Sequence, residues 1–369
     1  MAQDFSQNPY TPTFGEEPAV LAGRRALLAP VGRALRSETR RPELTTLISG
    51  ARGTGKTSLL SRLGETAADV GWISVDVTAS SEMLEDIELQ TKEKAAHIVE
   101  KAPQARLSSP GGQLMGSGLQ VGLTRTDEET NWRLRMARVL DQLERANSGL
   151  YITVDEVDPS ISALKELATV YQHFIREGRR VGLLMAGLPG NVSTLAADDA
   201  ASFLRRAKHY QIGRISAEEV KDGFRRTALS AGRDVEPEAL EAAAEAIYGY
   251  PYLLQLVGYY AWDASAGPSL DERPVAEGVE LARADFQAGV LRTTMRELSE
   301  RDLDFLGAML PDDGESAIAD LTKRLGWNSR SMVSEYRRRL IDAGVIGART
   351  RGRVGFEMPF LKDFLEEEL

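Results

Sequence analysis

A glycine-rich segment that could bind phosphate occupies residues 50–57. Its sequence matches the pattern G-x-x-x-x-G-K-[ST] and lies between an apolar β-rich run and an apolar helical pattern. A chance glycine-rich turn would lack that context. Glycines let backbone N–H groups bend around a phosphate at a helix N-terminus, Lys56 would reach the outer oxygens, and Thr57 would hold Mg²⁺. The residues predicted to bind the nucleotide here are Gly50, Ala51, Arg52, Gly53, Thr54, Gly55, Lys56, Thr57 and Ser58.

Two carboxylates, Asp155 and Glu156, end a second apolar run at 150–155. A phosphate-binding loop needs a carboxylate on a neighbouring strand to organise the metal. We expect Asp155 to bind Mg²⁺ through water, together with Thr57, and Glu156 to orient or deprotonate the attacking water. Alternation along an extended strand end would point the two carboxylates in different directions. Without the loop upstream, the pair would be interpreted as a solvated strand end.

These candidate residues need a parallel sheet to position them. Short β-rich runs alternate with helical patterns, which is typical of an α/β fold with helices on both faces of the sheet. The runs lie at 44–49, 72–77, 150–155, 181–186 and near 210–213, and the best-patterned helices lie at 132–143 and 161–174. The segment 80–130 has a weaker signal, and we interpret it as a helix plus a hairpin or loop.

The pattern divides the chain into four parts. Residues 1–20 are predicted to be an arm, 21–215 the sheet domain, and 216–292 a lid made of helices only. Residues 293–369 contain three helical segments followed by two β runs around a glycine turn. Three helices and a hairpin are the outline of a winged helix-turn-helix.

Composition excludes several kinds of chemistry. The 369 residues include no cysteine and three histidines, so disulfides, thiolate metal sites and a convincing zinc site are not expected. The net charge is −10, which argues against indiscriminate coating of nucleic acid. The start of the chain lacks a targeting pattern and no apolar stretch is long enough to span a bilayer, so we expect a cytoplasmic protein without a membrane partner.

Positive charge gathers in the last part of the chain. Residues 316–353 carry nine basic side chains against three acidic ones, whereas the whole chain is acidic. This segregation favours contact with double-stranded DNA through one helix and the hairpin tip. A module that docks a protein partner is the alternative. The candidate DNA contacts are Arg330, Ser331, Ser334, Arg338, Arg349, Arg351 and Arg353.

Together these features resemble the AAA+ ATPases of the Orc1/Cdc6-like and archaeal-ATPase group. The resemblance rests on the two motifs above, Gly23-Arg24-Arg25 ahead of the first strand, the helical lid and the C-terminal winged helix. It implies ATP and Mg²⁺ as ligands and places Gly23 and Arg24 beside the nucleotide. Gly249-Tyr250-Pro251 resembles the G-x-P lid motif of STAND ATPases, which implies that Pro251 lies against the adenine.

Some residues depart from the family pattern. Residues 185–189 offer no polar sensor at the end of the fourth strand, and 249–260 contain no lid arginine. Hydrolysis is therefore expected to be slow or stimulated by a partner. The family implies an arginine finger after the fourth strand, for which Arg205 and Arg206 are candidates. A solvated helix end is the alternative for these two arginines.

The first functional hypothesis is a nucleotide-dependent DNA-binding ATPase, similar to an initiator or loader, with a possible homo-oligomer in the ATP state. The second is a STAND-like regulatory ATPase with slow hydrolysis whose winged helix docks a protein. A transposition-type ATPase regulator is the third and would share the same site chemistry.

Overall fold

The computed structural model describes residues 7–13, 16–101, 131–327 and 329–368. Its centre is a five-stranded sheet in which all neighbouring strands are parallel, in the order β2-β3-β4-β1-β5. Parallel strands end at one edge of the sheet, so the carboxyl ends of β1 and β3 lie at the same edge with β4 between them. The strands are β1 (Thr45–Ser49), β2 (Ile73–Thr78), β3 (Leu150–Asp155), β4 (Val181–Gly187) and β5 (Lys208–Gln211).

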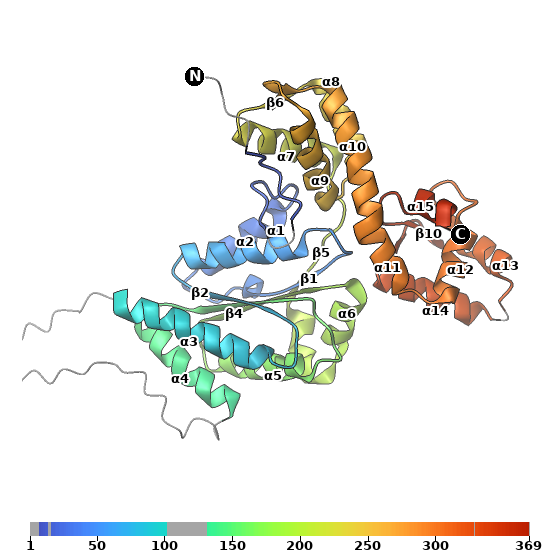
Figure 1. Cartoon of the computed structure of the whole chain (residues 1–369). Helices are drawn as coiled ribbons and strands as arrows, with labels where there is room; N and C mark the ends of the chain where they lie inside the picture. Colours follow the sequence, from blue (N-terminus) through green and yellow to red (C-terminus); the bar gives the residue numbers. More distant parts are fainter. Residues whose placement is uncertain (1–6, 14–15, 102–130, 328, 369) are drawn as a thin grey trace, which may run out of the picture.

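Helices cover both faces of this sheet, as predicted (Figure 1). Alternating strand residues point to opposite faces: Leu47 packs with α3, α4 and α5, whereas Ile48 packs with α1 and α2. Helix α3 lies within the segment whose structure the sequence left open, and residues 102–130 are outside the described residues. The helices of this domain are α1 (Arg25–Leu35), α2 (Lys56–Asp69), α3 (Met83–Lys101), α4 (Trp132–Arg145), α5 (Ser162–Arg176) and α6 (Pro189–Ala197), with short 3₁₀ segments at Pro42–Leu44 and Asp199–Arg206.

The lid follows β5. Ser216 begins it with a capping box, in which its hydroxyl accepts from the Glu219 N–H and the Glu219 carboxylate accepts from the Ser216 N–H. The expectation of helices only is wrong in one respect, because the loops after α7 and α9 run side by side and pair as the two-residue parallel strands β6 (Asp234–Val235) and β7 (Ser269–Leu270). The lid helices are α7 (Ala217–Ser230), α8 (Pro237–Ile247), α9 (Pro251–Ala264) and α10 (Glu272–Phe286).

The N-terminal segment 7–13 packs into the lid instead of only leading to the first helix. Tyr10 is 2% exposed, and its ring lies where a Cβ on Gly258 would be. The Tyr10 hydroxyl donates to the Phe224 carbonyl oxygen at 2.8 Å, and Asn8 donates to the Tyr259 carbonyl oxygen at 2.9 Å. A tyrosine in a polar segment was not expected to complete an apolar core.

The C-terminal module contains the predicted helices and hairpin, together with a short strand β8 and a last helix α15 that were not predicted. Its strands form an antiparallel sheet in the order β8-β10-β9. A five-residue π-helical segment, Gln287–Leu291, and α11 (Arg292–Arg296) continue α10 into this module (Figure 1). The elements are α12 (Glu300–Met309), β8 (Ser316–Ala317), α13 (Ile318–Leu325), α14 (Arg330–Asp342), β9 (Ile346–Ala348), β10 (Arg353–Phe356) and α15 (Leu361–Glu368).

One continuous apolar core joins the lid and the C-terminal module. Buried residues from α7 to α10 and from α12 to α15 belong to the same cluster. Phe286 of the lid packs edge-on against Phe360 of the module, with ring centroids 6.2 Å apart. Arg283 of the lid pairs with Asp363 at 2.7 Å. The lid and the module therefore form one packed unit beside the sheet domain.

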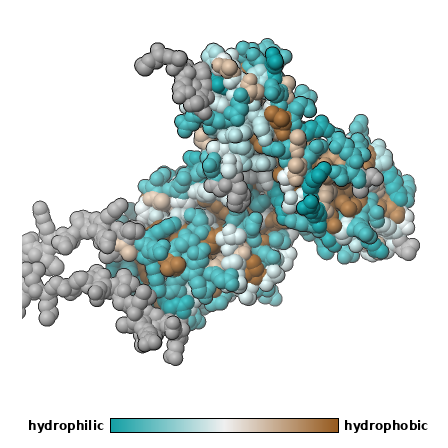
Figure 2. Space-filling model, viewed as in Figure 1, coloured by the Kyte–Doolittle hydropathy of each residue, from teal (hydrophilic) through white to brown (hydrophobic). Residues whose placement is uncertain are grey.

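The outer surface is largely hydrophilic on the face shown in Figure 2, where apolar residues lie in small separate groups. Among the described residues, no helix is both long and apolar enough to cross a membrane.

The packing of Tyr10 predicts a loss of lid stability on truncation. Tyr10→Ala should destabilise the lid by about 3–5 kcal/mol, the range for deleting a buried aromatic side chain, and Tyr10→Phe by about 1 kcal/mol for its single hydrogen bond. Hydrogen exchange of the α7 and α9 amides measures both effects. Leu229→Ala, at a side chain that is largely exposed, is the control. Equal protection in Tyr10→Ala and the wild type would contradict the packing.

Candidate nucleotide site

The loop between β1 and α2 has the backbone shape that binds an anion. Gly53 and Gly55 have φ of +72° and +82°, which only glycine adopts readily. A Cβ on Gly53 would lie 2.6 Å from a ring carbon of Tyr250, so space as well as conformation excludes a side chain. Helix α2 begins directly afterwards at Lys56, and the N–H groups of its first turn have no partner within the helix. The loop therefore fits the phosphates of a nucleotide.

Part of the loop's carbonyl groups are satisfied from within. The Lys56 ammonium group donates to the carbonyl oxygens of Gly50 and Ala51 at 3.0 and 2.9 Å. The Thr54 hydroxyl also donates to the Ala51 carbonyl oxygen, at 2.8 Å. Burial lowers the pKa of Lys56, and the nearby Asp155 carboxylate opposes that shift. The carbonyl groups of Gly50 and Ala51 therefore have donors, which leaves the N–H groups of the same loop for a ligand.

The remaining carbonyls of the loop are satisfied from outside it. Arg24, which is buried, donates to the Thr54 carbonyl oxygen at 2.8 Å and to the Gly213 carbonyl oxygen at 2.9 Å. The Tyr250 hydroxyl donates to the Arg52 carbonyl oxygen, and the Tyr252 N–H to that of Gly53 at 3.3 Å. Burial lowers the pKa of the Arg24 guanidinium and raises that of the Tyr250 hydroxyl. Arg24 thus braces the loop.

Gly23 and Pro251 lie close to the same loop. Gly23 has φ of +67°, and a Cβ there would lie 2.4 Å from the Ile215 side chain, so the chain before α1 passes directly against the start of the lid. A Cβ on Gly55 would lie 3.9 Å from the Cβ of Pro251. The lid proline that the family resemblance assigned to the adenine therefore stands beside the phosphate-binding loop.

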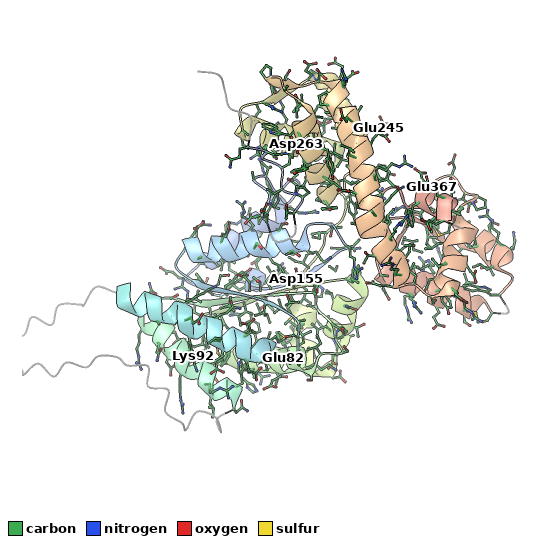
Figure 3. The ribbon with its side chains drawn as sticks, in the orientation of Figure 1. Glu82, Lys92, Asp155, Glu245, Asp263 and Glu367 are labelled. Atoms are coloured by element: carbon green, nitrogen blue, oxygen red, sulfur yellow. The ribbon has the colours of Figure 1, made fainter. Side chains whose placement is uncertain are left out.

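The two predicted metal-binding side chains meet at the carboxyl edge of the sheet, where Figure 3 marks Asp155. The Thr57 hydroxyl donates to the Asp155 carboxylate at 2.5 Å. A hydroxyl and a carboxylate side by side supply the oxygen ligands that Mg²⁺ prefers. The residues present therefore fit this metal.

Glu156 leaves the strand differently from the prediction. Strand β3 ends at Asp155, and Glu156 has φ of +53°, so the alternation of an extended strand does not apply to it. Its N–H donates to the Asp155 carboxylate at 2.8 Å, and its side chain is exposed. The chain therefore turns sharply between Asp155 and Glu156.

The C-terminal module contacts the phosphate-binding loop itself, which the sequence did not indicate. Arg52 pairs with Glu297 at 2.9 Å, and a Cβ on Gly344 would lie 2.8 Å from the Cβ of Ala51. Arg214, which follows β5, donates to the carbonyl oxygens of Phe356 and Glu357 at 3.1 and 2.8 Å. The loop is therefore enclosed between the lid on one side and the module on another.

The arginine-finger candidates lie at the end of the 3₁₀ segment before β5. Arg205 donates to the carbonyl oxygens of Ala196 and Ala197 at 3.2 and 2.7 Å, so its guanidinium closes the C-terminal end of α6. Arg206 is exposed. Both line a hollow of about 400 Å³ together with Gln172, Arg176, Ser202 and Phe203.

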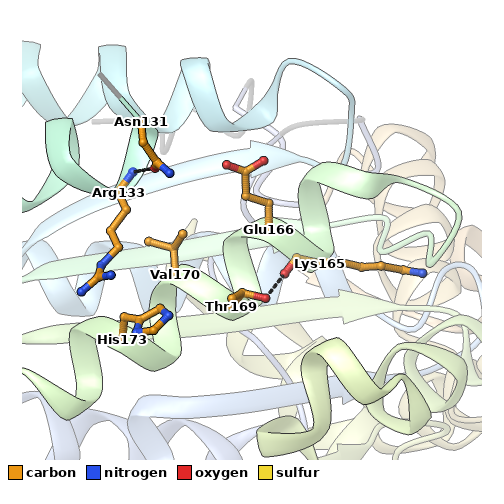
Figure 4. Close-up of a pocket in the computed structure, with 7 residues that line it drawn as sticks. All are labelled: Asn131, Arg133, Lys165, Glu166, Thr169, Val170 and His173. Atoms are coloured by element: carbon orange, nitrogen blue, oxygen red, sulfur yellow. Dashed lines mark hydrogen bonds between the residues drawn. The ribbon is translucent and has the colours of Figure 1, made fainter. Parts of the chain in front are cut away.

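A second hollow of about 400 Å³ lies between α4 and α5 (Figure 4). Its two basic residues other than histidine have carboxylate partners: Arg133 pairs with Glu177 and Lys165 with Asp198. Neither hollow is lined by a residue of the phosphate-binding loop or by Asp155 and Glu156. The residues that line the hollow between α4 and α5 are Asn131, Arg133, Lys165, Glu166, Thr169, Val170 and His173.

Most of the described candidate DNA contacts have exposed side chains, whereas Arg349 is bonded to neighbouring residues of the hairpin. Ser331, Ser334 and Arg338 on α14 are exposed, as are Arg351 and Arg353 on the hairpin. Arg349 pairs with Glu357 at 2.8 Å and also donates to the Phe356 carbonyl oxygen, which fixes it within the hairpin. The Arg330 side chain lies outside the described residues.

Comparison with known proteins identifies the sheet domain. Residues 20–186 match the model of the AAA ATPase domain family, and residues 288–365 match that of a domain family of unknown function, DUF8462. No curated protein matches the chain. The predicted ATPase domain is confirmed.

Solved structures share the fold over almost the whole chain. A Walker-type ATPase of Pyrococcus abyssi is similar with a TM-score of 0.67 and 16% identity, covering 98% of this chain and 99% of that one. The Aeropyrum pernix ORC2 protein, in its ADPNP-ADP complexes, is similar with a TM-score of 0.65 and 19% identity, covering 96% and 95%. The predicted P-loop fold of the Orc/Cdc6-like kind is therefore confirmed.

Loss of the Lys56 ammonium group should weaken ATP binding. Lys56→Ala removes a charged donor at the phosphate site, which is worth about 1.5–3 kcal/mol and corresponds to roughly a ten- to hundredfold loss of affinity. Titration with a fluorescent ATP analogue measures the loss. Lys208→Ala, at an exposed lysine on β5, should bind like the wild type.

Glu156→Gln should separate binding from hydrolysis. The amide cannot accept a proton, so turnover should fall by about a hundredfold or more while ATP affinity stays unchanged. Phosphate release measured beside the same binding titration tests this. Full turnover in Glu156→Gln would remove Glu156 from the role of general base.

Proposed function

We propose that this AAA ATPase is a nucleotide-dependent DNA-binding switch, similar to an initiator or loader. The nucleotide sets the position of the lid and the C-terminal module, and that position sets the grip of the module on duplex DNA. The observation that carries the proposal is the direct contact of the module with the phosphate-binding loop, through Arg52 with Glu297 and Ala51 with Gly344. A ligand that reshapes the loop acts on the module without an intermediary.

The shared core supports the mechanical part of this proposal. Because the lid and the module are packed together, through contacts such as Phe286 with Phe360, the module follows any movement of the lid. The lid reaches the loop through Tyr250 and Tyr252, and the module reaches it through Arg52 and Ala51. A nucleotide in the loop would therefore act on the same packed unit through two contacts, one with the lid and one with the module.

The module also offers a surface suited to DNA. The order of its elements, namely a helix, a short strand, two helices and a hairpin, is consistent with a winged helix-turn-helix. Arg338 on α14 and Arg351 on the hairpin are exposed and make no hydrogen bond or salt bridge with another described residue. The Arg353 guanidinium has one long contact, at 3.4 Å, with the Glu315 carbonyl oxygen. Exposed arginines of this kind bind phosphates readily.

In the catalytic part of the proposal, the loop N–H groups and Lys56 bind the β and γ phosphates, and Thr57 and Asp155 hold Mg²⁺. The metal would neutralise charge that develops on the phosphates. Glu156 accepts the proton of the attacking water. Arg206, which is exposed, is the better arginine-finger candidate for a neighbouring subunit in an ATP-bound oligomer, since Arg205 closes α6. Turnover without a neighbour or partner is expected to be slow.

One observation favours the second function, a STAND-like ATPase whose module docks a protein. Several basic residues of the module already have carboxylate partners within it: Arg324 pairs with Asp312, Arg339 with Asp302 and Arg349 with Glu357. These pairs lower the positive charge that the sequence count suggested. The DNA experiment below separates the two functions.

Duplex binding should depend on nucleotide and on salt. Arg351→Ala/Arg353→Ala should weaken binding to all duplex sequences about equally and lower the slope of log affinity against log salt by about two, because two phosphate contacts are lost. The measurement is fluorescence anisotropy of a labelled duplex at several salt concentrations with ATP, with ADP and without nucleotide.

The matched control is Arg41→Ala/Arg145→Ala, which removes two exposed arginines of the sheet domain. It should retain wild-type affinity and slope. If the wild type binds ATP but binds no duplex DNA in any nucleotide state, the DNA-binding proposal is wrong and the protein-docking function is favoured.

A further inference from the structure

The turn that carries Glu156 is held by contacts with the end of β4. The Val157 N–H donates to the Ala186 carbonyl oxygen at 2.9 Å. A Cβ on Gly187 would lie 3.1 Å from the Cβ of Val157, so β4 and the turn are in close contact. A glutamate with positive φ costs about 1–3 kcal/mol, and such a conformation persists only where its surroundings impose it.

Asn191 supplies one of these restraints from the first turn of α6. Its side-chain amide donates to the Val157 carbonyl oxygen at 2.9 Å, and the side chain is half-buried. Both backbone polar groups of Val157 are thus hydrogen-bonded, the N–H to β4 and the carbonyl oxygen to Asn191. Residues 185–189 include no polar side chain that could make such a bond, and Asn191 lies just beyond that range.

We infer that Asn191 is a positioning residue for Glu156, which it holds in the orientation needed for hydrolysis. Asn191 binds the backbone directly after Glu156, so its loss frees the turn without removing any donor from the phosphate-binding loop. Nucleotide binding and hydrolysis should therefore respond differently to its removal. The inference rests on the proposed role of Glu156 as general base, which Glu156→Gln tests separately, and it does not depend on DNA binding.

The same turn of α6 also contacts the C-terminal module. A Cβ on Gly190 would lie 2.5 Å from the Cβ of Asp342, the last residue of α14. Gly190 thus lets the end of α14 approach the helix that carries Asn191. In our inference, this contact makes the position of Glu156 depend on the docking of the module.

The first test is steady-state ATP hydrolysis by the full chain. Asn191→Ala should lower kcat by about tenfold or more, since a displacement of about 1 Å can cost a hundredfold, while the KM for ATP changes less than about twofold. Asn191→Gln, which keeps the amide donor, should recover part of kcat. Ser193→Ala, at an exposed residue of the same helix, should equal the wild type.

Two results would overturn the assignment. An unchanged kcat in Asn191→Ala would mean that the turn is held without this amide. A rise in KM as large as the fall in kcat, with no recovery in Asn191→Gln, would mean that the variant distorts the whole site. ATP affinity of each variant, measured by titration, identifies any loss of folding.

The second test uses Gly190→Ala, whose added methyl group should push the end of α14 away from α6. Gly190 lies in a helix with ordinary φ, so alanine suits the backbone and acts only on the contact with Asp342. Gly190→Ala should lower kcat, and Gly190→Ala/Asn191→Ala should be no slower than Asn191→Ala alone, because both changes act on one coupling. Multiplicative effects of the two changes, or an unchanged kcat in Gly190→Ala, would overturn the link to the module.

Discussion

A phosphate-binding loop can offer its N–H groups to an anion only if its carbonyl groups find other donors. In this protein the donors come from separate parts of the chain: Lys56 and Thr54 within the loop, Arg24 ahead of α1, and Tyr250 and Tyr252 in the lid. Each such bond is worth about 1 kcal/mol, or about 1.5–3 kcal/mol where the donor is charged. The anion site is therefore complete only when the lid is folded against the sheet domain.

The elements that follow local patterns could be predicted from the sequence. The four apolar runs became β1 to β4, and the run expected near 210–213 corresponds to β5 at Lys208–Gln211. Helix α4 buries Met136, Leu140 and Leu143 on the face that its periodicity indicated. The loop motif is contiguous and needs no long-range information. The contacts of Arg24, Tyr250 and Asn191 could not be predicted, because each joins residues about 30 to 200 positions apart whose spacing has no period. The burial of Tyr10 was not predicted, because its sequence neighbours are polar and the residues that it packs against lie in the lid.

The backbone at Glu156 differs from the extended strand end that the sequence predicted, because its φ is +53°. Strand alternation would separate Asp155 and Glu156 by pointing them to opposite faces of the sheet. In the structure the Asp155 carboxylate accepts from Thr57 through one oxygen and from the Glu156 N–H through the other. The second bond requires the chain to turn back on itself, and positive φ at Glu156 provides that turn. The turn at Glu156 therefore places its N–H beside the Asp155 carboxylate.

The energies of the contacts determine which part of the molecule can move. The Arg52–Glu297 pair is about half exposed, so it contributes at most about 1 kcal/mol to docking of the module on the loop. The core that joins the lid to the module buries several aromatic side chains, and deleting one of them costs about 3–5 kcal/mol. A nucleotide that distinguishes two conformations by about 1–3 kcal/mol can overcome the first contact but cannot separate the second. In the proposed switch, the lid and the module would therefore move together relative to the sheet domain. The first turn of α6 contacts both Val157 and Asp342, so it lies between the two parts that would move.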